Sequence, residues 1–454
     1  MRSAGVVCVL LAATLTGSPY AAAPDTQAQA SQPSDAIVLT LDDAIERGVR
    51  ASARLREAGA RTQMASAVAE QRRAASQPQV AVQAGYTRTN HVSPFILPVP
   101  GATGPVQPIY PDIPDNYRSR LDLQYPLYNS GRFAALEQAA RNESAAADAD
   151  ERTARADLSL EIARAYWTYV TTIEQLRVVE ESIGATRAHL ENARRRLDAG
   201  IVAPHEVFAI EAQESRQQLL AIQARGNRDV SEADLARLIG EPESRIQPAS
   251  PLAPAAPVTA GLAALVAEAS TRRTERQALS RRLTAAEERV KAAEVSNRPN
   301  VSAGGGFDYA SPNPRIFPRE RDWHTSWDVG VNVGWPLFDG GRNKAEVAEA
   351  SAATRAMRAR LDEFDSVLNV DVRRAVTELS ASIAAIETSE QGIRAAAEGR
   401  RVAGERFLAG VATSADVLDA QVALLQAELD RTQALAAGRL AEARVARAVG
   451  RSTP

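Results

Sequence analysis

The stretch Tyr125-Pro126-Leu127-Tyr128-Asn129-Ser130-Gly131-Arg132 decides the fold, because the chain contains the same pattern twice. The second copy, Trp335-Pro336-Leu337-Phe338-Asp339-Gly340-Gly341-Arg342, follows 210 positions later. In both copies alternating apolar and polar residues lead up to the proline, and a long proline-free segment begins at the arginine. Each copy therefore predicts a strand that turns directly into a helix. The residues expected to define this turn are Pro126, Gly131, Pro336 and Gly341.

Two further matches occur at the same offset. Ala199-Gly200-Ile201 corresponds to Ala409-Gly410-Val411, and Leu238-Ile239-Gly240 to Ala448-Val449-Gly450, again 210 positions apart. Repetition at a fixed offset indicates an internal duplication. We assign residues 37–240 to the first repeat and 260–450 to the second, with a Pro/Ala-rich connection at 241–259.

The N-terminal segment 1–23 is predicted to be a secretory signal. Arg2 provides a positive end, a short apolar core follows, and small residues allow cleavage anywhere within 22–30. Cys8, the only cysteine, lies inside this segment, so the mature chain would hold no disulfide or thiolate metal site. The net charge of −3 gives no indication of nucleic-acid binding.

Four strands are expected, two in each repeat, at about 78–90, 117–128, 299–311 and 325–338. Leu121, Leu123 and Tyr125 alternate with polar residues, and Trp327 begins a longer run of the same kind. Period-two alternation places one set of side chains on each face of a sheet. Strands of this length cross a bilayer when tilted. The loop between the first two strands, 93–114, is rich in proline.

Four strands cannot close a transmembrane barrel, and lipid cannot satisfy an open sheet edge. We therefore expect a barrel shared between chains: two copies supply eight strands, and three supply twelve, enough for a lumen. Aromatic residues concentrate in the strand regions, as the interfacial girdles of outer-membrane barrels require. The alternative is a pair of soluble hairpins packed on helices.

The segments between Arg132 and Gly200, and between Arg342 and Gly410, contain no proline. A seven-residue apolar repeat runs through both, which predicts left-handed coiled coils. A continuous helix of this length extends about 100 Å, several times the thickness of a membrane, and so must project into an aqueous space. The seam residues of the first repeat are Ile162, Tyr169, Leu176, Ile183, Leu190 and Leu197.

Gly200 and Gly410 each end a long helix and begin a turn into a second one. Pro204 suits a first helical position, and Thr413 with Asp416 fits a capping box. Asp416 and Asp419 share one helix face, so around a symmetry axis they would form carboxylate rings that bind cations. Asp416 as a cap and Asp419 as a solvated charge are the plainer interpretations.

On these motifs the chain resembles the TolC-like outer-membrane efflux protein family, from about Leu39 to Gly450. The resemblance implies a homotrimer in the outer membrane of a Gram-negative bacterium: an α+β membrane protein whose shared twelve-stranded barrel contacts lipid and continues into a periplasmic helical tunnel closed at its tip. It places Asp416 and Asp419 at the closed gate. Phe407 and Ala412 stand where the family can have a tyrosine and an arginine, which suggests a more apolar closure here.

The resemblance also implies partners: a periplasmic adaptor that docks on the helical tips, and an inner-membrane transporter. The expected docking residues are Gly200, Ile201, Glu206, Val207, Gly410, Val411, Asp416 and Val417. The predicted function is the passive exit duct of a tripartite efflux system. Alternatives are the exit duct of a type I protein secretion system and, from another class, a non-channel envelope coiled-coil protein. No catalytic motif, cofactor site or metal site is expected.

Overall fold

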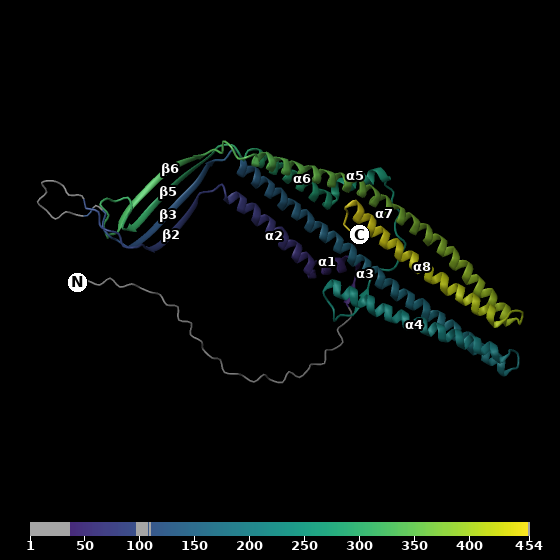
Figure 1. The fold of residues 1–454 in the computed structure, drawn as a ribbon. Coiled ribbons are helices and arrows are strands. Elements are labelled where there is room, and N and C mark those ends of the chain that lie inside the picture. The colour runs from purple at the N-terminus through teal and green to yellow at the C-terminus, as the bar shows by residue number, and fades with distance from the viewer. Residues whose placement is uncertain (1–36, 97–107, 109, 453–454) are drawn as a thin grey trace, which may run out of the picture.

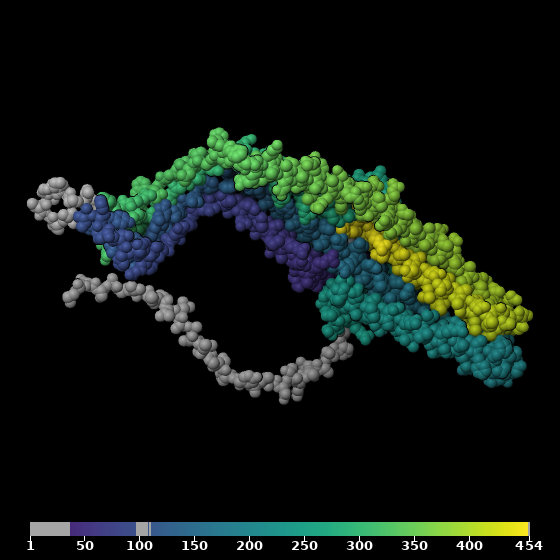
Figure 2. All heavy atoms as spheres, in the orientation of Figure 1, coloured from purple at the N-terminus to yellow at the C-terminus, as the bar shows by residue number. Residues whose placement is uncertain are grey.

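The computed structural model describes residues 37–96, 108 and 110–452 of an elongated molecule (Figures 1 and 2). A β-sheet forms one end, and two helical hairpins extend to the other. The predicted signal segment 1–23 and its cleavage region 22–30 lie outside the described residues, as does most of the central part of the predicted loop 93–114.

The sheet contains four antiparallel strands in the order β2-β3-β5-β6. Their bounds are β2 Gln79–Arg88, β3 Asp115–Tyr128, β5 Asn300–Ser311 and β6 His324–Gly334. The two hairpins, one from each repeat, join through β3 and β5. Strands β2 and β6 are the outer strands, and among the described residues each pairs on one side only.

The fourth strand is shorter than predicted. The sequence pattern indicated a strand to residue 338, but β6 ends at Gly334. Gly334 pairs with Asn300, the first residue of β5, so β6 has no neighbouring backbone beyond that point. Strand β3 continues through Pro126 to Tyr128 because β5 still lies beside it, across a bulge.

The two faces of the sheet differ in chemistry. Trp327 of β6 and Leu121 of β3 lie on an apolar face, and Trp327 is 71% exposed in the single chain. Arg120 and Asp328, from neighbouring positions of the same strands, lie on the opposite face and are bonded to each other. This arrangement matches the predicted alternation and is typical of a sheet with lipid on one side and water on the other.

Glycines in the left-handed region turn each strand into its helix. Gly131 has φ 84° and precedes helix α3; Gly341 has φ 90° and precedes helix α7. The residue two positions before each glycine accepts from an amide of the first helical turn: Asp339 accepts from Asn343 N at 2.8 Å, and Asn129 accepts from Phe133 N at 3.3 Å. The repeated motif thus encodes the predicted turn.

The two longest helices of one repeat match those of the other in length. Helices α3 and α7 each have 67 residues, and α4 and α8 each have 36. The helices are α1 Leu41–Ala51, α2 Ala53–Ala74, α3 Arg132–Asp198, α4 Pro204–Ile239, α5 Leu262–Arg272, α6 Thr274–Glu294, α7 Arg342–Leu408 and α8 Ser414–Val449. Among the described helices, none is long and apolar enough to cross a membrane.

Helices α3 and α7 run unbroken from the sheet to the far tips (Figure 1). Near the sheet α3 packs with α2 and α6, and α7 packs with α6; toward the tips α3 packs with α4 and α8, and α7 packs with α8. Residues of the predicted heptad seam are buried along α3, including Ile162, Leu176 and Leu190. The seven-residue apolar period therefore marks the packed side of the helix, as expected of a coiled coil.

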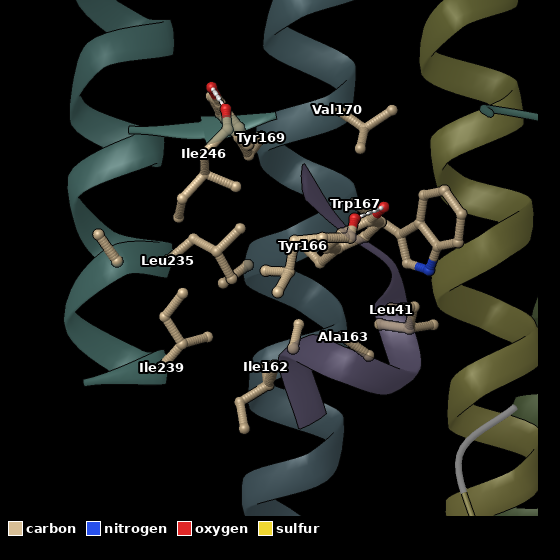
Figure 3. Packing of buried hydrophobic residues seen from close by; sticks show 14 of the residues in the cluster. Leu41, Ile162, Ala163, Tyr166, Trp167, Tyr169, Val170, Leu235, Ile239 and Ile246 are labelled. Carbon is tan, nitrogen blue, oxygen red and sulfur yellow. Dashed lines mark hydrogen bonds between the residues drawn. The ribbon is translucent and has the colours of Figure 1, made fainter. Parts of the chain in front are cut away.

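The main apolar core lies halfway along the molecule, where the sequence predicted only a connection. Strands β1 (Ile37–Leu39) and β4 (Ile246–Pro248) form a short parallel ladder there. Tyr166, Trp167 and Leu235 pack beneath it, as Figure 3 shows. This core fixes the N-terminal segment and the connection between the repeats against α3 and α4.

Tyr166 should contribute strongly to stability. Its fully buried hydroxyl donates to Leu39 O at 3.1 Å and accepts from Ser250 N at 3.0 Å. The substitution Tyr166→Phe leaves both backbone groups unpaired, so we expect a loss of about 2 kcal/mol, seen as a lower midpoint in thermal unfolding in detergent. Tyr128→Phe, at an exposed position, is the control. Equal midpoints for the two variants would contradict this assignment.

Candidate functional site

The candidate site is the pair of hairpin tips farthest from the sheet. Gly200 ends α3 with φ 72°, and Gly410 ends α7 with φ 76°, so both occupy the left-handed position predicted for them. The next amide of each turn reaches back to the helix: Ile201 N donates to Arg196 O at 2.8 Å, and Val411 N donates to Arg406 O at 2.9 Å. Both turns are the same helix C-terminal motif.

The second helix of each hairpin begins as predicted. Pro204 is the first residue of α4. Thr413 caps α8, and Asp416 accepts from Thr413 N at 2.8 Å and Thr413 Oγ1 at 2.9 Å, which completes a capping box. These hydrogen bonds, the backbone one first, hold the pKa of Asp416 below its usual range. Asp416 is therefore ionised at neutral pH.

Arg196 of the first hairpin binds the C-terminal end of α7, the long helix of the second hairpin. Its guanidinium donates to Phe407 O at 2.7 Å and to Leu408 O at 3.0 Å, which are carbonyls of the last turn of α7. It also lies 4.8 Å from the centre of the Phe407 ring. Cations are favourable at a helix C-terminus, so this contact stabilises the packing of the two tips against each other within one chain.

A buried histidine makes the next contact between the hairpins. His189 Nε2 lies 2.9 Å from Ser414 Oγ, and its ring meets the Phe407 ring edge-on at 5.0 Å. Ser414 N donates to Glu206 at 3.3 Å. Burial lowers the pKa of His189, while the nearby Glu206 carboxylate acts in the opposite direction. At neutral pH the imidazole is uncharged.

The predicted gate residues fall into two groups. Asp416 and Asp419 are exposed on the first turns of α8. Phe407 is only 3% exposed and packs between His189 and Arg196. Phe407, which was predicted to make the closure of the gate more apolar, is therefore buried within one chain.

The predicted docking residues divide in the same way. Gly200, Ile201, Gly410 and Val411 are exposed; Ile201 and Val411 are both 64% exposed at matching positions of the two repeats. Glu206 is half-buried against the second hairpin. Val207 and Val417 are buried, and Val207 packs in a cluster that includes Leu418 of the second hairpin. Among the predicted docking residues, the exposed apolar side chains are thus those of the two turns, Ile201 and Val411.

Sequence reasoning did not identify the roles of His189, Arg196 and Ser414. Each lies in a helix that the sequence predicted, but their contacts join residues more than 200 positions apart, which no local pattern indicates. The one available signal was the heptad seam, because His189 precedes the seam residue Leu190 and so falls on the packed side of α3.

We expect the tips to loosen in mild acid. A buried histidine with a lowered pKa stabilises the packed state fully above the ordinary histidine pKa of about 6.5, and this stability declines as the pH falls below that value. Hydrogen exchange over residues 407–414, corrected for intrinsic rates, should therefore be faster at about pH 5.5 than at about pH 7.5. The His189→Gln variant keeps a polar group but should lose the pH dependence. An equal acid response in this variant would refute the role of His189.

Comparison with known proteins agrees with this architecture. The model of the family described as "Outer membrane efflux protein" matches residues 46–241 and 265–451. CyaE of Bordetella pertussis is 29% identical over 387 residues, covering 84% of this chain and 78% of CyaE. MdtP of Escherichia coli, a multidrug resistance outer membrane protein, is 25% identical over 405 residues, with 86% and 79% covered. AprF of Pseudomonas aeruginosa, an alkaline protease secretion protein, is 23% identical over 320 residues, with 69% and 65% covered.

Solved structures show the same fold. CusC superimposes with a TM-score of 0.78 at 16% identity, covering 90% of this chain and 92% of CusC. VceC, an outer membrane protein of Vibrio cholerae, gives 0.75 at 23% identity, covering 91% and 97%. With both repeats matched and the TolC-like fold shared, this chain belongs to the outer membrane efflux protein family and is an outer-membrane channel rather than an enzyme.

Proposed function

We propose that three copies of this chain form the exit duct of a tripartite efflux system. In this assembly the sheets close a twelve-stranded barrel in the outer membrane, and the helices form a tunnel in the periplasm. The duct is passive, and an inner-membrane transporter supplies the energy through a periplasmic adaptor.

The observation that carries this proposal is the sheet with two incomplete edges. Strands β2 and β6 each pair on one side only within the described chain, while the apolar face between them is exposed. Backbone groups cannot remain unpaired in lipid, so β6 of one copy must pair with β2 of the next. Three copies give twelve strands, a number that leaves room for a lumen.

The tips support the second part of the proposal. Ile201 and Val411 present two equivalent apolar points at the end of each chain, next to glycines that leave the turn narrow. Three chains would display six such points in a ring, alternating between first and second repeats. A helical hairpin of an adaptor could pack its apolar residues between them.

Protein export is the second candidate, because AprF is named for alkaline protease secretion while MdtP is named for multidrug resistance. Both uses need the same duct, and the two relatives match this chain at similar identity. A non-channel spacer gives no role to the exposed apolar face of the sheet. We favour efflux of small molecules, since the relative named for drug resistance matches the larger share of this chain.

The channel and its gate can be tested together. In planar lipid bilayers the purified trimer should give discrete current steps, small at rest and blocked by trivalent cations from the periplasmic side. Removing the carboxylate rings with Asp416→Ala and Asp419→Ala should weaken that block at least about tenfold and raise the resting current. Thr413→Ala, which disturbs the cap of α8 but keeps both carboxylates, is the matched control.

Two results would count against these assignments. Protein that stays monomeric and gives no current would contradict the proposed duct. Current steps with unchanged cation block in the double variant would contradict the gate alone.

Docking depends on the exposed turn residues. The changes Ile201→Asp and Val411→Asp place charges on the apolar points, so we expect loss of adaptor crosslinking and a severalfold drop in drug resistance of the host, with normal amounts of trimer in the outer membrane. Val230→Asp, at an exposed apolar position in the middle of α4, is the control and should behave as wild type. Undiminished crosslinking in the double variant would place docking elsewhere.

A further inference from the structure

A hollow of about 480 Å³ lies halfway along the helices, where α3, α8 and α7 run side by side. Its lining comes from residues 164–175 of α3, 378–382 of α7 and 433–444 of α8. This volume falls within the range of sites that hold drug-sized molecules, about 300 to 1,000 Å³. We call this hollow the central groove.

On α3 the central groove lies opposite the connection between the repeats. The connection side is marked by Tyr166, whose hydroxyl accepts from Ser250 N at 3.0 Å. Arg164 and Thr168, which line the groove, each stand two positions from Tyr166, about 160° around the helix.

Helix α8 shows the same division into two faces. Residues 256–259 of the connection, together with Glu442 and Ala446 of α8, line a separate hollow on one face. Arg444, which lines the central groove, stands two positions from both of these α8 residues, about 160° away. The central groove and the connection therefore lie on opposite faces of the helical wall.

The proposed function decides which of these faces is the inner one. On the connection side α1 packs on α3 and α4, and α5 packs on α7 and α8, so this side carries a second layer of structure. Three such layers pointing inward would obstruct a tunnel, so in the proposed trimer they lie on the outside. The central groove then opens into the passage.

The groove combines an apolar floor with polar rims. Ala436, Ala437 and Leu440 of α8 form the floor. Trp167 closes the α3 side: its indole is only 6% exposed and is directed from α3 toward α8 (Figure 3). Gln175 contributes a neutral amide to the rim. Such a surface suits a molecule with a flat apolar body and one polar end.

The charge of the groove favours an anion. Its ionisable lining residues are Arg164, Arg444 and Glu378, two cations and one anion. Arg444 is bound to Glu378 at 3.0 Å. Arg164 is exposed and makes no hydrogen bond or ion pair with any residue that the structure describes. Its guanidinium is therefore available to a carboxylate, which it can bind through two parallel hydrogen bonds.

The groove is not duplicated along with the rest of the chain. At the offset of 210, Trp167 corresponds to Thr377, and Arg444 corresponds to Asp234. The equivalent positions thus lack the indole and have a carboxylate in place of a guanidinium. A trimer would hold three such grooves rather than six.

We propose that the central groove binds small organic anions with an apolar ring body, whose carboxylate is held by Arg164. This inference rests on the proposed function, which places the groove on the tunnel wall. The ring lies on the alanine floor beside Trp167. Such molecules are then retained briefly at the middle of the passage.

The test is calorimetric titration of the purified full-length protein in detergent with 2-naphthoate, after subtraction of its binding to empty micelles. We expect one site per chain. Arg164→Gln should bind at least about tenfold more weakly, because it loses hydrogen bonds to a charged group. Arg374→Gln removes the exposed arginine at the corresponding position of the second repeat, and it should bind as the wild type does. The neutral 2-naphthamide should not distinguish Arg164→Gln from the wild type.

A second variant tests the floor of the groove. Ala437 is exposed, so Ala437→Phe should fill the groove without disturbing a core, and it should abolish binding while Arg164 remains. Equal weakening in Arg164→Gln and Arg374→Gln would show a general effect of charge and overturn the site, as would wild-type binding in Ala437→Phe. Normal binding by a protein that gives no current in planar bilayers would instead contradict the proposed channel.

Discussion

The need to pair backbone hydrogen-bonding groups at the edges of the sheet is the constraint on which the rest of the molecule depends. One chain supplies four strands and completes three interfaces, which leaves β2 and β6 each without a partner on one side within the described residues. In lipid such edges must be paired by another copy. In the proposed duct, rotational symmetry follows from the sheet, and every other element must be compatible with an axis that lies outside the single chain.

The turn from strand to helix transmits this symmetry to the rest of the molecule. Gly131 and Gly341 lie at equivalent positions, and each starts a helix of 67 residues. Equal lengths bring the tips of both repeats to the same distance from the membrane. In the proposed trimer, duplication of one unit would therefore produce a nearly uniform ring of helices, although the two hairpins of a chain differ in sequence.

Features encoded by local periodicity were predictable from the sequence, and features made by distant contacts were not. Strand alternation, the heptad seam, and the glycines at 200 and 410 depend on residues close in sequence, so their patterns predicted the elements correctly. The predicted end of β6 was wrong, because the strand ends where its neighbour β5 begins. The β1–β4 ladder and the His189 contacts join segments about 200 residues apart, and no local pattern records such pairs.

The two ends of the molecule are held by different kinds of interaction. At the tips, Arg196 binds backbone carbonyls and His189 packs uncharged against Phe407, so separation of the hairpins exposes apolar surface and frees helix-end carbonyls. Salt has little effect on the free energy of either change. At the other end, on the sheet, ion pairs such as Arg315 with Asp328 are partly exposed, and salt screens their attraction. The packing of the tips should therefore depend little on salt concentration, whereas the ion pairs at the end of the sheet should weaken as it rises.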